Sequence, residues 1–120
     1  MINVGIDLVE ISRLQNSISR ANFLQRCFCD SEIEQYYKHN KLTYLAGRFA
    51  AKEAVVKALG TGLIEGLSLT DIEITQMPSG APNVVLKDKA LEIANMLGIS
   101  KWLISISHTA NYATAIVLAE

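Results

Sequence analysis

The sequence has little cysteine, little net charge and no long apolar run, and each shortage excludes a class of protein. The two cysteines, Cys27 and Cys29, lie one residue apart, which is too close for an ordinary structural disulfide and fits reduced thiols in a cytosol. No apolar run approaches the length of a membrane-spanning helix, and Met1 is not followed by a basic targeting segment. We therefore expect a cytoplasmic protein without a membrane partner.

The charge balance limits the possible ligands further. The 120 residues carry a formal net charge of −1, so no global basic field attracts nucleic acid, and a few placed cations must hold any anionic ligand. A metal site at the two cysteines would need two more ligands, and only His39 lies nearby, so small apolar side chains are the simpler interpretation. Gly60 and Gly62 follow a predicted helix instead of preceding one, which excludes a P-loop.

What the sequence does have is regular apolar spacing, enough for one domain over residues 1–120. Alternating patterns predict strands over residues 2–9, 68–75, 84–86, 102–107 and 112–119, with a hairpin turn at 77–82. Helical spacing predicts helices over residues 10–20, from residue 30, over 42–59 and over 87–97. The expected fold class is α+β, with one long central helix and shorter helices packed on a small, mostly antiparallel sheet.

The first predicted strand carries apolar residues on one face and a glycine and an aspartate on the other. The face that the alternation assigns to the core carries Ile2, Val4, Ile6 and Leu8. On the opposite face, Gly5 indicates a close backbone approach and clears space beside Asp7. A carboxylate in an apolar strand is costly unless it is hydrogen-bonded, paired or bound to a metal. A metal ligand and a structural residue at a strand end are both open interpretations of Asp7.

The long predicted helix carries most of the remaining candidates. Glu53 and Lys57 have the spacing of an ordinary surface ion pair, yet alanines at 46, 50, 54 and 58 would let this flank approach another surface closely. Arg48 and Lys52 lie on or near the apolar side, where their stems could snorkel to solvent. Together with Asp7, this set of carboxylates and cations favours Mg²⁺ held by two carboxylates, phosphate oxygens and water.

A histidine follows the fourth strand, in the run Ser-Ile-Ser-His-Thr. His108 could hydrogen-bond a phosphate there, or it could simply belong to the turn. We find no Ser-His-Asp or Cys-His arrangement of the kind that nucleophilic catalysis needs.

Three motifs together are similar to those of the bacterial holo-acyl-carrier-protein synthases, the short trimeric type of 4′-phosphopantetheinyl transferase. They are GIDLVEI at residues 5–11, RFAAKEAVVKALGTG at 48–62, and SISHT at 105–109 followed by Tyr112 and Ala113. The second motif is specific, and the order, the spacing and the chain length also fit. The resemblance therefore covers the whole chain, although residues 21–43 match only loosely.

The resemblance implies an activity and its cofactor. Such an enzyme transfers the 4′-phosphopantetheine group from coenzyme A to a serine of apo acyl carrier protein in fatty-acid biosynthesis, and releases adenosine 3′,5′-bisphosphate. By resemblance, Asp7 and Glu53 would hold Mg²⁺, and Lys57 would lie beside the same phosphates. The carrier supplies the nucleophile, and the sequence leaves open which group accepts the serine proton.

The same resemblance implies further contacts and an assembly. Arg48 and His108 would contact the nucleotide end of coenzyme A, Arg13 would dock the acidic carrier, and subunits would form a homotrimer with sites at the interfaces. The residues implied to run along the ligand are Gly60, Thr61, Gly62 and Thr109. Two alternatives remain open: a Mg²⁺-dependent nucleotide hydrolase, and a non-catalytic module that binds a nucleotide or an acidic helix.

Overall fold

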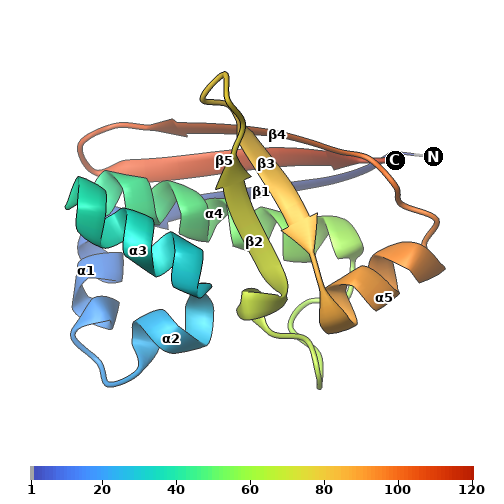
Figure 1. Ribbon diagram of the computed structural model, residues 1–120, viewed down its shortest axis with the longest axis horizontal. Coiled ribbons are helices and arrows are strands. Elements are labelled where there is room, and N and C mark those ends of the chain that lie inside the picture. Colours follow the sequence, from blue (N-terminus) through green and yellow to red (C-terminus); the bar gives the residue numbers. More distant parts are fainter. Residues whose placement is uncertain (1) are drawn as a thin grey trace.

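The computed structural model describes residues 2–120, and its α+β architecture confirms the predicted class (Figure 1). The strands are β1 (Asn3–Glu10), β2 (Ile72–Gln76), β3 (Pro82–Leu86), β4 (Trp102–His108) and β5 (Tyr112–Ala119). The helices are α1 (Ile11–Ile18), α2 (Phe23–Cys27), α3 (Asp30–His39), α4 (Leu42–Leu59) and α5 (Asp88–Met96), with a 3-10 turn, η1, at Leu69–Asp71.

The five strands form two antiparallel sheets instead of one. The larger sheet has the order β1-β5-β4, so β5 is central, and β2 and β3 form the predicted hairpin. Helix α4 packs along β1 and β5, and the hairpin contacts both α4 and β4 (Figure 1). The long helix is therefore the element around which both sheets are arranged.

The buried face of β1 is the opposite of the predicted one. Gly5 and Val9 are buried against α4, whereas the apolar residues of the other face are between 57% and 66% exposed: Ile2, Val4, Ile6 and Leu8. The reason is the approach of α4, since a Cβ added to Gly5 would lie 1.8 Å from the backbone oxygen of Ala54. Only a strand face with a glycine at this point can lie so close to a helix.

Several smaller expectations also differ from the structure. Helix α2 was not predicted, and η1 replaces the first part of the strand expected from residue 68. Leu97 was expected to point inward, but it follows the last turn of α5 and is 50% exposed. Helix α4 ends as predicted at Gly60, whose left-handed φ of 79° suits a glycine C-cap. Within residues 2–120, no helix has both the length and the apolar character needed to cross a bilayer.

We expect Gly5→Ala to destabilise the fold strongly, because the new methyl group meets helix backbone that cannot move aside. Overpacking of this kind should lower the free energy of unfolding by about 3 kcal/mol, measured by denaturant titration. Gly47→Ala is the matched control. Its Cβ would meet the Cγ2 methyl of Ile106 at 2.9 Å, a side-chain contact instead of a backbone one, and alanine favours helix, so the change should stay within about 1 kcal/mol.

Candidate active site

The fold brings Asp7 and Lys57 into direct contact. Lys57 Nζ lies 2.9 Å from Asp7 Oδ1 and donates a second hydrogen bond, of 3.0 Å, to the backbone oxygen of Ile6. On the neighbouring strand, Thr114 Oγ1 donates to the backbone oxygen of Asp7 at 2.8 Å. The ion pair expected between Glu53 and Lys57 is absent from residues 2–120, because Lys57 reaches across to β1 instead.

Glu53 and Asp7 line one cleft, and no ion pair among residues 2–120 compensates the negative charge of Glu53. Desolvation by its half-buried position raises the pKa of the Glu53 carboxyl, and the nearby charge of Asp7 raises this pKa further, against a smaller opposing effect of Lys57. The cleft has a volume of about 280 Å³. Its lining includes Asp7, Glu10, Arg13, Phe23, Phe49 and Glu53.

The donor chemistry of this cleft fits Mg²⁺. A carboxylate whose pKa is raised by a neighbouring carboxylate marks a favourable place for a cation, and Mg²⁺ commonly takes one or two protein carboxylates. No cluster of three or more histidine, cysteine, aspartate or glutamate side chains suited to a metal occurs within residues 2–120. Phosphate oxygens and water would therefore have to complete the coordination shell.

Arg48 lies in a different cleft, of about 250 Å³, between α3, α4 and β2. Its guanidinium carbon sits 4.2 Å from the ring centre of Tyr44. Its Nε is buried without a hydrogen-bond partner among the described residues. A buried donor without a partner is costly, so this cleft is suited to an anionic group.

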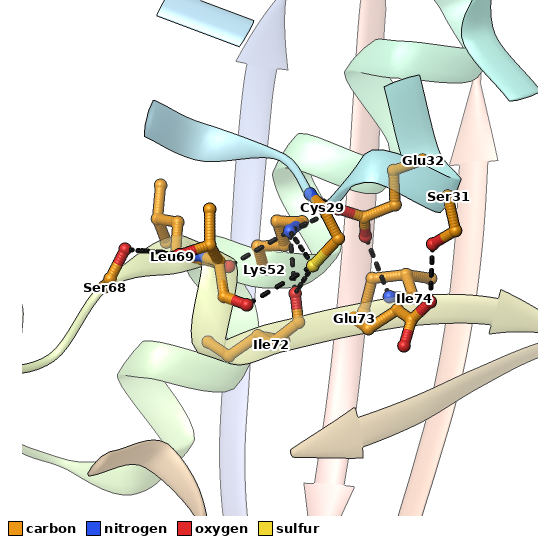
Figure 2. Close-up of polar contacts among 10 residues, drawn as sticks. Cys29, Ser31, Glu32, Lys52, Ser68, Leu69, Ile72, Glu73 and Ile74 are labelled. Carbon is orange, nitrogen blue, oxygen red and sulfur yellow. Dashed lines mark hydrogen bonds and ion pairs between the residues drawn. The ribbon is translucent and has the colours of Figure 1, made fainter. Parts of the chain in front are cut away.

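Lys52 lines neither the Asp7 cleft nor the Arg48 cleft. The snorkelling interpretation is wrong, because its side chain is fully buried and pairs with Glu32 at 2.5 Å. Figure 2 shows Lys52 among Glu32, Cys29 and the backbone oxygens of η1 and β2. Glu32 was missed by the sequence analysis, and its only signal was its position three residues into the region of a predicted helix start.

The remaining candidates lie at the ends of their elements. His108 and Thr109 are exposed at the end of β4, and Thr109 Oγ1 accepts the backbone N–H groups of Asn111 and Tyr112. Strand β5 separates β4 from β1, so two strand spacings, about 10 Å, lie between the backbones that carry His108 and Asp7. A single chain therefore does not bring His108 to the Asp7 cleft.

The other candidates lie at the end of α4 and on α1. Gly60, Thr61 and Gly62 are exposed and follow directly after the end of α4, three residues beyond Lys57, and they do not line the carboxylate cleft. The Arg13 side chain is 84% exposed on α1, and its Nε lies 3.9 Å from Glu10 Oε1. Arg13 thus stands at the rim of the cleft that contains both carboxylates.

Comparison with known proteins identifies the family. The family model described as the 4′-phosphopantetheinyl transferase superfamily matches residues 3–117. The chain belongs to this superfamily. The resemblance of its three motifs to the holo-acyl-carrier-protein synthases is thereby confirmed.

Individual members of the superfamily match over nearly their full length. The chain is 47% identical over 123 residues to the holo-[acyl-carrier-protein] synthase of Clostridium kluyveri, with 100% of this chain and 90% of that protein covered. It is 43% identical to the protein of that name from Hydrogenovibrio crunogenus, with 100% and 97% covered. The Helicobacter pylori holo-[acyl-carrier-protein] synthase, solved in complex with coenzyme A, matches with a TM-score of 0.86 and 38% identity over 98% of this chain and 99% of that one.

We predict that Glu53→Gln raises the melting temperature of the metal-free protein at pH 7, by about 2 °C, because it removes a charge that the fold disfavours. The pKa of Glu53 is raised in the folded state, so the charged form costs stability above that pKa. The gain should vanish as the pH falls below about 4, where the carboxyl is protonated in both folded and unfolded chains.

Calorimetry in EDTA between pH 7 and pH 4 measures this difference. Glu34→Gln, an exposed change on α3, is the control and should have no such pH-dependent effect. A lower melting temperature for Glu53→Gln at pH 7 would mean that a partner stabilises the Glu53 charge, contrary to the prediction.

Proposed function

We propose that this chain is a holo-acyl-carrier-protein synthase, a single 4′-phosphopantetheinyl transferase domain that acts in fatty-acid biosynthesis. It transfers the 4′-phosphopantetheine group from coenzyme A to a serine of apo acyl carrier protein. The observation that carries the proposal is the cleft that Asp7 and Glu53 share, with Lys57 paired to Asp7, in a chain of this superfamily. The coenzyme A complex of the Helicobacter pylori relative supports the choice of donor. The free thiols of Cys27 and Cys29 suit the cytoplasm, where we place the reaction.

The chain's own residues would act by position and charge. In the reaction, the carrier serine oxygen forms a bond to the β-phosphorus of coenzyme A, and the pyrophosphate bond breaks to release adenosine 3′,5′-bisphosphate. Asp7 and Glu53 would hold Mg²⁺, which when bound supplies Lewis-acid stabilisation of phosphate charge. Lys57 is already oriented by Asp7 and the Ile6 carbonyl, so its ammonium can donate to phosphate oxygens with little reorientation of the side chain.

Two further regions would hold the rest of the donor. The buried, unpartnered Nε of Arg48 suits a phosphate at the nucleotide end of coenzyme A. His108 and Thr109 would contact the same end, and Gly60, Thr61 and Gly62 would run along the ligand where they adjoin Lys57. We propose that the complete site combines residues of two subunits, as the family resemblance implies.

The outer face of the larger sheet supports such an assembly. Val4, Leu118 and Leu103 lie opposite one another on the three strands, as do Ile6 and Ile116, and all are exposed apolar side chains. A contiguous apolar face of this kind usually marks an interface. We propose that it joins copies of this chain into the homotrimer expected from the family resemblance.

Arg13 is proposed to dock the carrier. It is exposed at the rim of the carboxylate cleft, so a carrier bound there could present its serine to that cleft. An arginine suits an acidic partner because its guanidinium can pair with carboxylates bidentately. Electrostatic docking of this kind weakens as salt concentration rises.

Intact-mass spectrometry tests the proposed reaction directly. With coenzyme A, Mg²⁺ and apo acyl carrier protein, the carrier should gain the mass of one phosphopantetheine group, and EDTA should abolish the gain. Asp7→Ala should lower the rate by about 100-fold or more, because it removes a proposed metal ligand and frees Lys57. Circular dichroism should show that this variant stays folded.

Two outcomes would contradict the proposal. Release of adenosine bisphosphate from coenzyme A without any carrier would point to a nucleotide hydrolase. Binding of coenzyme A in EDTA without any turnover would point to a non-catalytic module.

We predict that Ile6→Glu disrupts the assembly, because it places a charge in the middle of the apolar face. In sedimentation velocity, the wild-type protein should have about three times the chain mass of 13.2 kDa, and the variant about one chain mass. Transfer activity should fall with assembly. Met96→Glu, a change at a 79% exposed residue on α5, is the control that should leave both unchanged. A monomeric, active wild-type protein would contradict shared sites.

A further inference from the structure

A buried ion pair joins three elements in the interior. Lys52 Nζ on α4 lies 2.5 Å from Glu32 Oε1 on α3, and it donates to the backbone oxygens of Leu69 and Ile72 at 3.0 and 2.7 Å. Glu32 Oε2 accepts the backbone N–H of Ile74 on β2 at 2.8 Å (Figure 2). Both side chains are at most 1% exposed, so α3, α4 and β2 are tied together by fully desolvated charges.

Stability alone does not account for this arrangement. The desolvation cost of a buried ion pair offsets much of its attraction, and apolar side chains of similar size are often as stabilising. The particular property of such a pair is its geometry, because each bond fixes a distance and a direction. The pair therefore acts on any surface whose shape depends on the relative position of α3, α4 and β2.

The Arg48 cleft is such a surface. All of its lining comes from α3, α4 and β2, and includes Ser31, Gln35, Tyr44, Arg48, Glu73 and Gln76. Lys52 lies one helical turn after Arg48 on the same side of α4, and its partner Glu32 itself lines the cleft. Ile74, which Glu32 holds by its N–H group, is itself part of the β2 wall.

A second hydrogen bond joins α3 to β2 on the solvent side of the cleft. Ser31 on α3 donates to Glu73 on β2 at 2.5 Å, in an exposed position. The inner link is buried and ionic, whereas this outer one is exposed to solvent, where hydrogen bonds add little. The separation of α3 and β2, and with it the width of the cleft, is therefore set mainly by Glu32 and Lys52.

We propose that Glu32 and Lys52 are positioning residues, which hold the Arg48 cleft at the width that fits the nucleotide end of coenzyme A. This inference rests on the proposed function. It separates their role from that of Asp7 and Glu53, which line the other cleft, and from that of Lys57, which pairs with Asp7. Loss of the pair should therefore weaken coenzyme A binding while leaving the carboxylate cleft and carrier docking intact.

The test uses the double variant Glu32→Gln/Lys52→Met, which removes both charges and leaves no buried charge uncompensated. The expected result is a KM for coenzyme A raised about tenfold, with kcat and the KM for the carrier within about twofold of wild type. Faster hydrogen exchange at the Ile74 amide should accompany this change. Glu32→Asp, which keeps the charge but shortens the side chain by one methylene, should show a smaller rise and replaces the double variant if that fails to fold.

A destabilised control separates positioning from general loss of stability. Ile93→Ala removes a buried side chain of α5, which does not line the Arg48 cleft, so it should lower the melting temperature without changing the KM for coenzyme A. Folded variants of the pair with an unchanged KM would overturn the inference while wild-type transfer upholds the proposed function. A wild-type protein that neither binds nor turns over coenzyme A would overturn the proposed function itself.

Discussion

The close contact between β1 and α4 is the constraint on which the site depends. Gly5 presses against the backbone of Ala54, and no side chain can intervene. Because alternate residues of a strand share a face, Asp7 then faces the same helix, near the turn that carries Glu53 and Lys57. The smallest residue of the strand and the small residues of the helix thus bring together charges that are about fifty residues apart in the chain.

The same contact determines what is left uncovered. With its small-residue face against α4, β1 turns its large apolar side chains outward, where β5 and β4 continue the apolar surface. Strand β1 is therefore packed against α4 on its inner face and apolar on its outer face, as is usual for a strand that is covered on both sides. Strand β5 separates His108 from Asp7 within the single chain, and the proposed assembly would cover the apolar outer face of the sheet.

The order of helices and strands was largely predictable from sequence, since local periodicity decides it, and the motifs at residues 5–11 and 48–62 identified the family. The inner face of β1 was not predictable in this way, because its exposed apolar residues alternate along the strand just as core residues do. Nor was the burial of Lys52, whose partner Glu32 lies 20 residues earlier in a stretch without a family motif. Long-range pairs of this kind depend on tertiary packing that no local pattern encodes.

The contact between Lys57 and Asp7 has a consequence for how the cleft changes on loading. Without a ligand, the ammonium acts as a resident counterion that keeps one carboxylate compensated, while Glu53 has no ion-pair partner within residues 2–120. In the proposed reaction, a cation taking over Asp7 would release the ammonium toward the phosphates that arrive with it. Binding of the cation and its phosphates would then exchange one counterion of Asp7 for another, with little change in the total charge of the cleft. The ligand-free protein does not have to tolerate two uncompensated carboxylates side by side.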